Sequence, residues 1–135
     1  MAEFTGGCMC GQLRYSATAE PVFTGVCHCK NCQKLTGTAF STNVGVPKAA
    51  LSIQGSLKEY QFDGGSGQVV SLQSCPNCGS PISSEATALP GISIIKAGTL
   101  DYTSSLKPTI EIFCDSAQTW VGLAGGMQRF PAAPG

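Results

Sequence analysis

The stretch Cys75-Pro76-Asn77-Cys78-Gly79 has the spacing of a zinc knuckle, in which a tight turn brings two thiolates to one ion. Backbone N–H groups of such a turn donate to the sulfurs, and the glycine lets the turn close without a Cβ clash. Two thiolates are half of a tetrahedral site, so the knuckle needs a second pair. Cys8-Met9-Cys10 is the one other cluster with two thiols and no more. We therefore expect a closed structural zinc site that ties the start of the chain to its middle, formed by Cys8, Cys10, Cys75 and Cys78.

A third cluster, Cys27-His28-Cys29-Lys30-Asn31-Cys32, places three thiols in one short segment. Three protein ligands leave one position of a zinc ion open to water or substrate, as in catalytic sites. Zinc lowers the pKa of a bound thiol, so a small thiol at that position is held as thiolate at neutral pH, ready to attack a carbonyl compound. The spacing predicts two zinc ions, the second one bound by Cys27, Cys29 and Cys32. The alternative is that His28 or Cys114 supplies a fourth ligand and closes this site too.

His28 and Cys114 also fit roles outside the metal site. His28 stands between two presumed ligands, and in extended backbone its side chain points away from theirs. We expect it behind the ligands or at the surface. Cys114 ends the run from Ile110, where alternation places it on the opposite face from Glu111. That pattern predicts a small buried core thiol.

Basic residues lie beside the open cluster. Lys30 and Lys34 flank it and are the substrate candidates, since either offers a cation to offset thiolate charge or to hold a substrate carboxylate. Arg14, on a neighbouring predicted strand, offers the same charge. Each is also consistent with a solvated surface cation. The sequence assigns no general base and no catalytic residue beyond the metal ligands.

Eight cysteines also permit four disulfides. Cys8 and Cys10, like Cys27 and Cys29, lie too close in sequence to bridge one another easily, whereas extended backbone points both thiols to one side, ready to chelate an ion. The chain starts without the charged and apolar segments of a signal peptide, and the cytosol is reducing. Zinc is therefore favoured over a disulfide framework, and we expect a soluble cytoplasmic protein.

The composition limits the classes of partner that the protein can bind. The chain has 135 residues, which suits one domain with a genuine core. Charged residues are only 12% of the total, with eight basic against eight acidic and one His. There is no basic field of the kind that drives nucleic-acid binding, and no stretch approaches the length that spans a bilayer. We expect small-molecule partners, with neither nucleic acid nor membrane among them.

Short segments rich in β-branched and aromatic residues, broken by Gly, Pro, Asn or Ser, predict a mainly β fold with little helix. The expected strands are Gln12–Ala17, Pro21–Val26, Ala39–Val46, Leu51–Gln54, Leu57–Phe62, Gln68–Ser74, Ile92–Ala97 and Thr109–Cys114. Asp63–Gly67 is expected to be a hairpin connection, since glycine tolerates positive φ. Single helical turns are expected at Asn31–Leu35 and Tyr102–Leu106.

The domain prediction follows from this pattern. Residues 1–121 are expected to form a single zinc-binding β domain. Residues 122–135 contain Gly125-Gly126 and end in Phe130-Pro131-Ala132-Ala133-Pro134-Gly135, which carries little apolar surface. We expect a loosely ordered C-terminal tail there.

The three clusters together resemble a known pattern. Gly6-Gly7-Cys8-Met9-Cys10-Gly11-Gln12-Leu13-Arg14-Tyr15, then Cys27 to Cys32 with Thr36-Gly37, then Cys75-Pro76-Asn77-Cys78-Gly79-Ser80 are similar to the glutathione-dependent formaldehyde-activating enzyme family, which includes the centromere protein V relatives. The resemblance runs from about Gly6 to about Cys114. Three ordered clusters are far more specific than a single Cys-x-x-Cys.

The resemblance implies a zinc-stapled, Mss4-like β fold and the same division of cysteines into a structural and a catalytic-type zinc site. It implies condensation of glutathione with formaldehyde to S-hydroxymethylglutathione, a carbon–sulfur lyase reaction read in reverse. Two departures from the family pattern stand out: Ser74 where a Phe is frequent, and Glu111 where a late-strand His is frequent. The second departure bears on the exact substrate more than on fold or metal.

The function expected is therefore a zinc-dependent enzyme that joins a small thiol, with glutathione implied, to an aldehyde such as formaldehyde. The alternative is a non-catalytic zinc module that binds a partner protein, with both zinc sites structural. The two differ in whether the site at Cys27, Cys29 and Cys32 is open.

Overall fold

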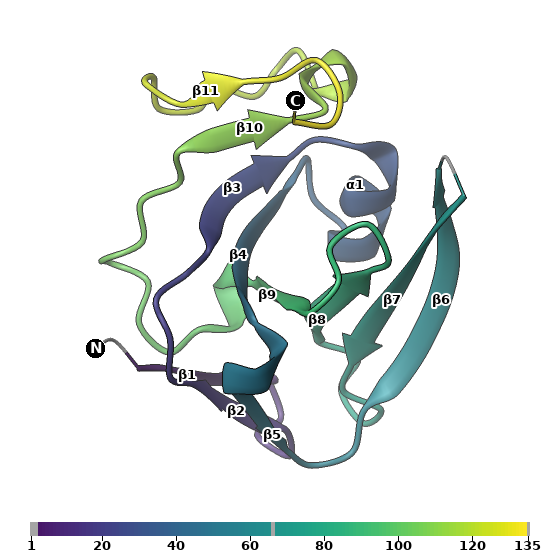
Figure 1. Ribbon diagram of the computed structural model, residues 1–135, viewed down its shortest axis with the longest axis vertical. Helices are drawn as coiled ribbons and strands as arrows, with labels where there is room; N and C mark the ends of the chain where they lie inside the picture. The colour runs from purple at the N-terminus through teal and green to yellow at the C-terminus, as the bar shows by residue number, and fades with distance from the viewer. Residues whose placement is uncertain (1–2, 66, 135) are drawn as a thin grey trace.

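A computed structural model of the chain describes residues 3–65 and 67–134. Within them it contains two β-sheets and one short α-helix (Figure 1). Met1 and Ala2 of the expected domain, Ser66 of the expected hairpin connection and Gly135 of the expected tail lie outside the described residues. The predicted mainly β fold with little helix is confirmed.

The smaller sheet has three antiparallel strands, in the order β1 (Phe4–Gly7), β2 (Arg14–Ala17) and β5 (Leu51–Gln54). β1 approaches the segment after β9 so closely that an isolated bridge joins Gly6 to Leu100. A Cβ at Gly6 would collide with the Tyr15 ring and the Thr99 carbonyl, so this approach requires glycine. The loop between β1 and β2 carries the first cysteine pair.

The larger sheet has eight strands. Their order is β11 (Gln128–Arg129), β10 (Ile110–Ile112), β3 (Phe23–Cys27), β4 (Ser41–Pro47), β9 (Ile92–Lys96), β8 (Pro81–Ala86), β7 (Gln68–Ser74) and β6 (Lys58–Gly65). β10 runs parallel to both of its neighbours, and the other pairs are antiparallel. The sheet therefore brings the ends of β3, β4, β9 and β10 together from distant parts of the chain.

The core lies where the small sheet meets the middle of the large one. Its most buried apolar members come from β2, β4, β8 and β9 and from the first loop: Leu13, Tyr15, Ala17, Val44, Val46, Ile82 and Ile95. Cys8 and Cys75 belong to the same buried cluster. Burial of these side chains provides the main folding free energy, and a metal at the cysteines would add to it.

The helix α1 (Lys30–Thr36) begins directly after β3. Cys29 is its N-cap, and its sulfur accepts a hydrogen bond from the Cys32 N–H. The helix ends at Gly37, which has a φ of 68° and donates its N–H to the Gln33 carbonyl. The predicted helical turn at Asn31–Leu35 is confirmed, and Cys29 is the N-cap of the helix that contains it.

The strand prediction is correct in most places. Three strands are missing from it, β1, β8 and β11, because glycine, serine and proline dilute the apolar alternation in the first two and β11 has only two residues. No helix forms at Tyr102–Leu106, but a single hydrogen-bonded turn lies there, in which the Leu106 N–H donates to the Thr103 carbonyl at 3.0 Å. The expected hairpin connection at Asp63–Gly67 begins too early, because β6 runs on to Gly65 and pairs with β7 there. At this end of β6 the Gly65 N–H donates to the Asp63 carboxylate at 2.8 Å.

The C-terminal segment returns to the sheet. β11 pairs with β10, and backbone carbonyls of Phe130, Pro131 and Ala132 accept from the N–H groups of residues 113–115. Figure 1 shows this segment running across the end of the large sheet above β10. The domain boundary at residue 121 stays a prediction.

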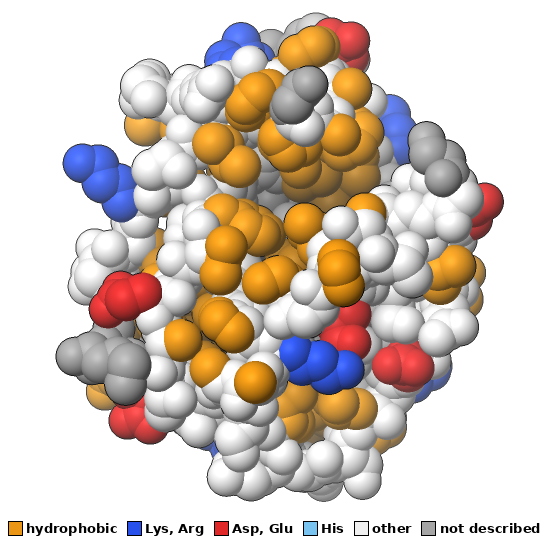
Figure 2. Space-filling view, in the orientation of Figure 1, with side chains coloured by type: hydrophobic (Ala, Val, Ile, Leu, Met, Phe, Trp, Pro, Cys, Tyr) orange, Lys and Arg blue, Asp and Glu red, His pale blue; other side chains and the backbone are white. Residues whose placement is uncertain are grey.

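Charged side chains are scattered on the face that Figure 2 shows, and apolar side chains occupy much of it. Lys and Arg side chains stand apart from one another there, in line with the low charge content. Within the described part of the chain, no helix is long and apolar enough to cross a bilayer.

Candidate metal centres and an adjoining cavity

The first cysteine group joins the β1–β2 loop to the turn between β7 and β8. Ligand atoms of Cys8, Cys10, Cys75 and Cys78 all lie within 4.8 Å of one another. The Cys8 and Cys10 sulfurs are 3.5 Å apart, and those of Cys10 and Cys75 are 3.8 Å apart. Four sulfurs at these separations match the donor set of a closed tetrahedral zinc site.

The backbone around this group is arranged for thiolates. The Leu13 N–H donates to the Cys8 sulfur at 3.3 Å, and the Cys78 N–H donates to the Cys75 sulfur at 3.5 Å. A hydrogen bond from the Ser80 hydroxyl is the main reason why the pKa of Cys78 falls to about 5. Gly79 has a φ of 79° and donates to the Cys75 carbonyl, which closes the knuckle turn. The residues present therefore fit a divalent ion held by four thiolates.

The second group lies at the junction of β3 and α1. Cys27 is the last residue of β3, Cys29 caps the helix and Cys32 lies in its first turn. Their sulfurs are all within 4.8 Å of one another. Hydrogen bonds from the thiols of Cys27 and Cys32 hold the pKa of Cys29 far below its ordinary value. A thiolate is thus stabilised in this group, as a metal site requires.

Neither candidate fourth ligand joins this group. His28 and Cys114 belong instead to a separate cluster with Glu111, whose ligand atoms lie within 4.8 Å of one another. His28 is only 2% exposed, and its Nε2 is 2.9 Å from Glu111 Oε1. The imidazole thus points away from the three sulfurs, as strand alternation predicts, but it is buried and not at the surface.

The sequence pattern gives the wrong side for Cys114. Phe113 has a φ of 55°, a left-handed conformation that is unusual for a bulky residue, and it ends the alternation of β10. Cys114 therefore turns to the same side as Glu111, begins the 3-10 helix η3 (Cys114–Ser116) and is only partly buried. The expected buried core thiol is instead a cavity-lining thiol.

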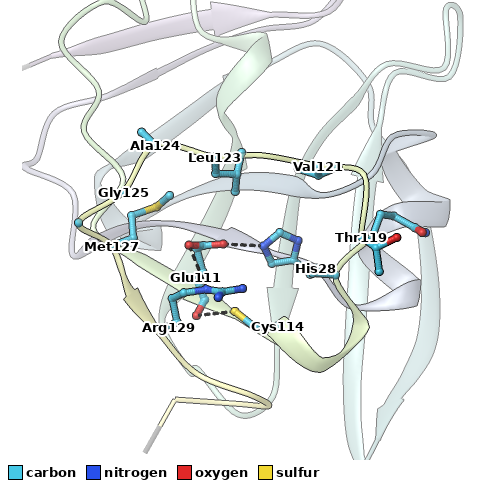
Figure 3. A pocket seen from close by; sticks show the side chains of 13 residues that line it. His28, Glu111, Cys114, Thr119, Val121, Leu123, Ala124, Gly125, Met127 and Arg129 are labelled. Carbon is cyan, nitrogen blue, oxygen red and sulfur yellow. Dashed lines mark hydrogen bonds and ion pairs between the residues drawn. The ribbon is translucent and has the colours of Figure 1, made fainter.

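A cavity of about 520 Å³ opens beside this third cluster (Figure 3). Figure 3 shows His28, Glu111, Cys114 and Arg129 surrounded by the segment from Thr119 to Met127. Arg129 Nε lies 3.5 Å from Glu111 Oε2, so the carboxylate has one basic partner at each oxygen. An imidazole, a carboxylate and a thiol facing one cavity suit either a metal ion or a nucleophilic cysteine. None of the residues lining the cavity is Cys27, Cys29 or Cys32.

Two glutamines connect the helix to the wall of the cavity. Gln33 Nε2 donates to the carbonyls of His28 and Ser116, at 2.7 and 3.1 Å. Gln118 Nε2 donates to Gln33 Oε1 at 2.7 Å. The cavity wall is therefore held to α1, whose first turn and N-cap carry two of the three cysteines of the second group.

The candidate substrate lysines lie on the surface. Lys30 and Lys34 are both exposed residues of α1. Arg14 forms a bidentate pair with Asp101, with Nη1 and Oδ1 3.0 Å apart. Its guanidinium is therefore engaged within the protein.

Sequence reasoning missed Lys96, at the end of β9. Its side chain is buried, and Nζ donates to Ser41 Oγ at 3.1 Å. Burial lowers the pKa of Lys96, and the charges of Cys32, Cys27 and Cys29 oppose that effect. The signal in the sequence was a lysine inside an apolar strand, Ile92-Ser93-Ile94-Ile95-Lys96, but only the sheet order shows what it faces.

The chain is similar to a known enzyme family in sequence and to a solved structure in fold. Residues 3–116 match the family model described as glutathione-dependent formaldehyde-activating enzyme. A solved structure described as the crystal structure of a Rhodobacter sphaeroides protein, a structural genomics target, has 18% sequence identity to the chain and a TM-score of 0.60. The match covers 77% of this chain and 91% of that chain, and at this identity it shows a shared fold alone. No curated protein matches the chain.

Proposed function

The chain belongs to the glutathione-dependent formaldehyde-activating enzyme family, and we propose that it catalyses the addition of a small thiol, with glutathione as the family's thiol, to an aldehyde such as formaldehyde. The S–H bond adds across the C=O bond. Sulfur bonds to carbon, the carbonyl electron pair moves to oxygen, and oxygen takes up a proton to give S-hydroxymethylglutathione. In the reverse direction this is a carbon–sulfur lyase reaction.

The observation that carries this proposal is the difference between the two cysteine groups. Cys8, Cys10, Cys75 and Cys78 offer four sulfurs, which is a complete tetrahedral set. Cys27, Cys29 and Cys32 offer three, while His28 and Cys114 are engaged elsewhere. We propose two zinc ions, a structural one at the first group and a catalytic-type one at the second.

The ion at the second group would supply Lewis acidity that keeps a substrate thiol ionised at neutral pH. The residues of the chain hold and orient the site. Cys27 ends β3 and Cys29 caps α1, and the hydrogen bond from the Cys32 N–H fixes the Cys29 sulfur at the helix start. The buried Lys96 Nζ donates to Ser41 Oγ, and Ser41 faces Cys27 across the β3–β4 pair. Lys30 and Lys34 stay the candidates for a substrate carboxylate, because both are exposed, Lys30 at the start of α1 and Lys34 in its last turn.

A direct test measures adduct formation by NMR with zinc-loaded protein, glutathione and formaldehyde. We expect a rate above that of the protein-free mixture, which Cys32→Ala abolishes. Cys114→Ala is the matched control, because it removes a nearby thiol that lies outside the three-sulfur group. It should leave the rate unchanged.

The opposite result has a definite meaning. Loss of activity in Cys114→Ala with retention in Cys32→Ala would move the chemistry to the cavity of His28 and Glu111. A protein rate equal to that of the protein-free mixture would favour the alternative function, a zinc module that binds a partner protein. Cobalt-substituted protein separates these functions too, since an added thiol changes the absorption spectrum only where a coordination position is open.

Cytoplasmic localisation is part of the proposal and rests on thiol chemistry. Eight unpaired cysteines, two of them exposed, persist in a reducing compartment. Small-molecule partners fit the scattered surface charge better than nucleic acid does.

A further inference from the structure

The Lys96 amino group is buried without an acidic partner in the described part of the chain. Only 6% of the residue is exposed. Its Nζ donates to two neutral oxygens, Ser41 Oγ at 3.1 Å and Asn43 Oδ1 at 3.4 Å, and no ion pair joins it to a carboxylate within residues 3–65 and 67–134. Burying an ammonium in this way is costly unless a negative charge lies nearby.

The sheet places this ammonium beside the three-cysteine group. Cys27 faces Ser41 across the β3–β4 pair, and Asn43 faces Lys96 across the β4–β9 pair. The hydrogen bond from Lys96 to Ser41 therefore reaches back along β4 toward Cys27. Burial lowers the pKa of Lys96, and negative charge at Cys32, Cys27 and Cys29 opposes that shift. The thiolates are thus the counter-charge that the buried lysine otherwise lacks.

A count of formal charges shows what Lys96 does for the site. Three thiolates and one divalent ion sum to a single negative charge, and the ammonium brings the total to zero. A neutral fourth ligand keeps this balance, whereas an anionic ligand adds one negative charge in a partly buried place. Without Lys96 the same anionic ligand would raise the total to two negative charges, which desolvation penalises more strongly.

We propose that Lys96 is the residue that makes an anionic fourth ligand, such as a thiolate, acceptable at the three-cysteine site, and that its loss shifts the preference of the site toward a neutral donor. The effect works through charge, so Lys96 is a positioning residue and not a ligand. This inference rests on the proposed function, because it assumes a metal ion bound by Cys27, Cys29 and Cys32. It assigns to a buried lysine the charge compensation that the exposed Lys30 and Lys34 were expected to provide.

The experiment uses full-length, cobalt-substituted protein and follows its absorption spectrum during titration with three ligands. 2-Mercaptoethanol is a thiol without carboxylates, azide is a simple anion, and imidazole is a neutral donor. In Lys96→Met we expect the affinity for 2-mercaptoethanol and azide to fall about tenfold or more, the scale of one nearby charge in a partly screened site. Imidazole affinity should stay within about twofold. Lys96→Arg restores the charge and should recover most of the anion affinity.

The controls separate charge from structure. Lys48→Met removes an exposed lysine that pairs with Glu85, and should leave all three affinities unchanged. If Lys96→Met does not fold, Lys96→Gln replaces it, because its amide still donates to Ser41 without the charge. Circular dichroism and the cobalt bands of the four-cysteine site report on folding in each variant.

The outcomes distinguish the two claims. Equal affinities of wild type and Lys96→Met for azide and thiol would overturn the role of Lys96, as would a parallel loss of imidazole binding. Azide binding that depends on Lys96, without any thiol binding, would support the role of Lys96 and count against the proposed function. A wild type that takes none of the three ligands would refute both.

Discussion

Loss of the four-cysteine site should destabilise the protein more than loss of the three-cysteine site, because the two proposed metal ions would close chain loops of very different length. Cys10 and Cys75 are 65 residues apart, whereas Cys29 and Cys32 are three apart. Applying the loop-closure relation for cross-links, a clip over about 65 residues contributes about 4 kcal/mol, and a clip over a few residues about 2 kcal/mol. We predict that Cys10→Ala lowers the free energy of unfolding by about 4 kcal/mol and Cys32→Ala by about 2 kcal/mol.

Differences in side-chain packing would not produce the predicted order of the two variants. Cys10 is exposed, while Cys32 is partly buried in α1. Packing losses would therefore affect Cys32→Ala more than Cys10→Ala, which is the reverse of the predicted order. Only a loop closed by the proposed metal would make the Cys10 variant the weaker protein.

The assay is equilibrium urea unfolding followed by circular dichroism in zinc-containing buffer. With a typical urea dependence of about 2 kcal/mol/M, the Cys10→Ala midpoint should fall by about 2 M. Repeating the wild type with a strong chelator should bring its midpoint to that of Cys10→Ala or below it. Equal losses in the two variants, or a larger loss in Cys32→Ala, would refute the argument that the first group joins distant parts of the chain.

Three further predictions concern pH and packing. The Arg14 hydrogen bond lowers the pKa of Asp101 below its ordinary value. The stabilisation that the ionised Asp101 carboxylate gives the folded protein is therefore present above about pH 3.8 and is lost as the pH falls. The melting temperature of Asp101→Asn should accordingly fall less on acidification than that of the wild type. Burial raises the pKa of Tyr15 to about 12, so the free energy of unfolding should fall as the pH rises from about 10 to about 12. Urea unfolding at several pH values should show a smaller alkaline loss in Tyr15→Phe. Gly45→Ala should cost about 1–3 kcal/mol in urea unfolding, because the new Cβ would collide with the Phe23 ring; a neutral effect would mean that the ring moves aside freely.

Local spacing predicted the structure well wherever a few neighbouring residues form the feature. The knuckle at residues 75–79 forms its turn within five residues, and β3, α1 and the Cys29 cap follow one another without a break. The strands with clear apolar alternation, such as β5 and β7, lie where the pattern places them. Strand β1 was missed because half of its residues are glycine, and its pairing depends on a close approach to residues 99 and 100.

Spacing along the chain grouped only the thiols that lie one or two residues apart, whereas the folded chain brings Cys8 and Cys10 to Cys75 and Cys78. The assignment of these groups to zinc stays a prediction. The charged groups around them depend on the folded arrangement. The register of β3, β4 and β9 lets Lys96 donate to Ser41, which faces Cys27. Cys114 turns toward Glu111 because Phe113 adopts a left-handed conformation. Sheet pairing and backbone turns bring together side chains from distant segments, and no local pattern records which segments become neighbours.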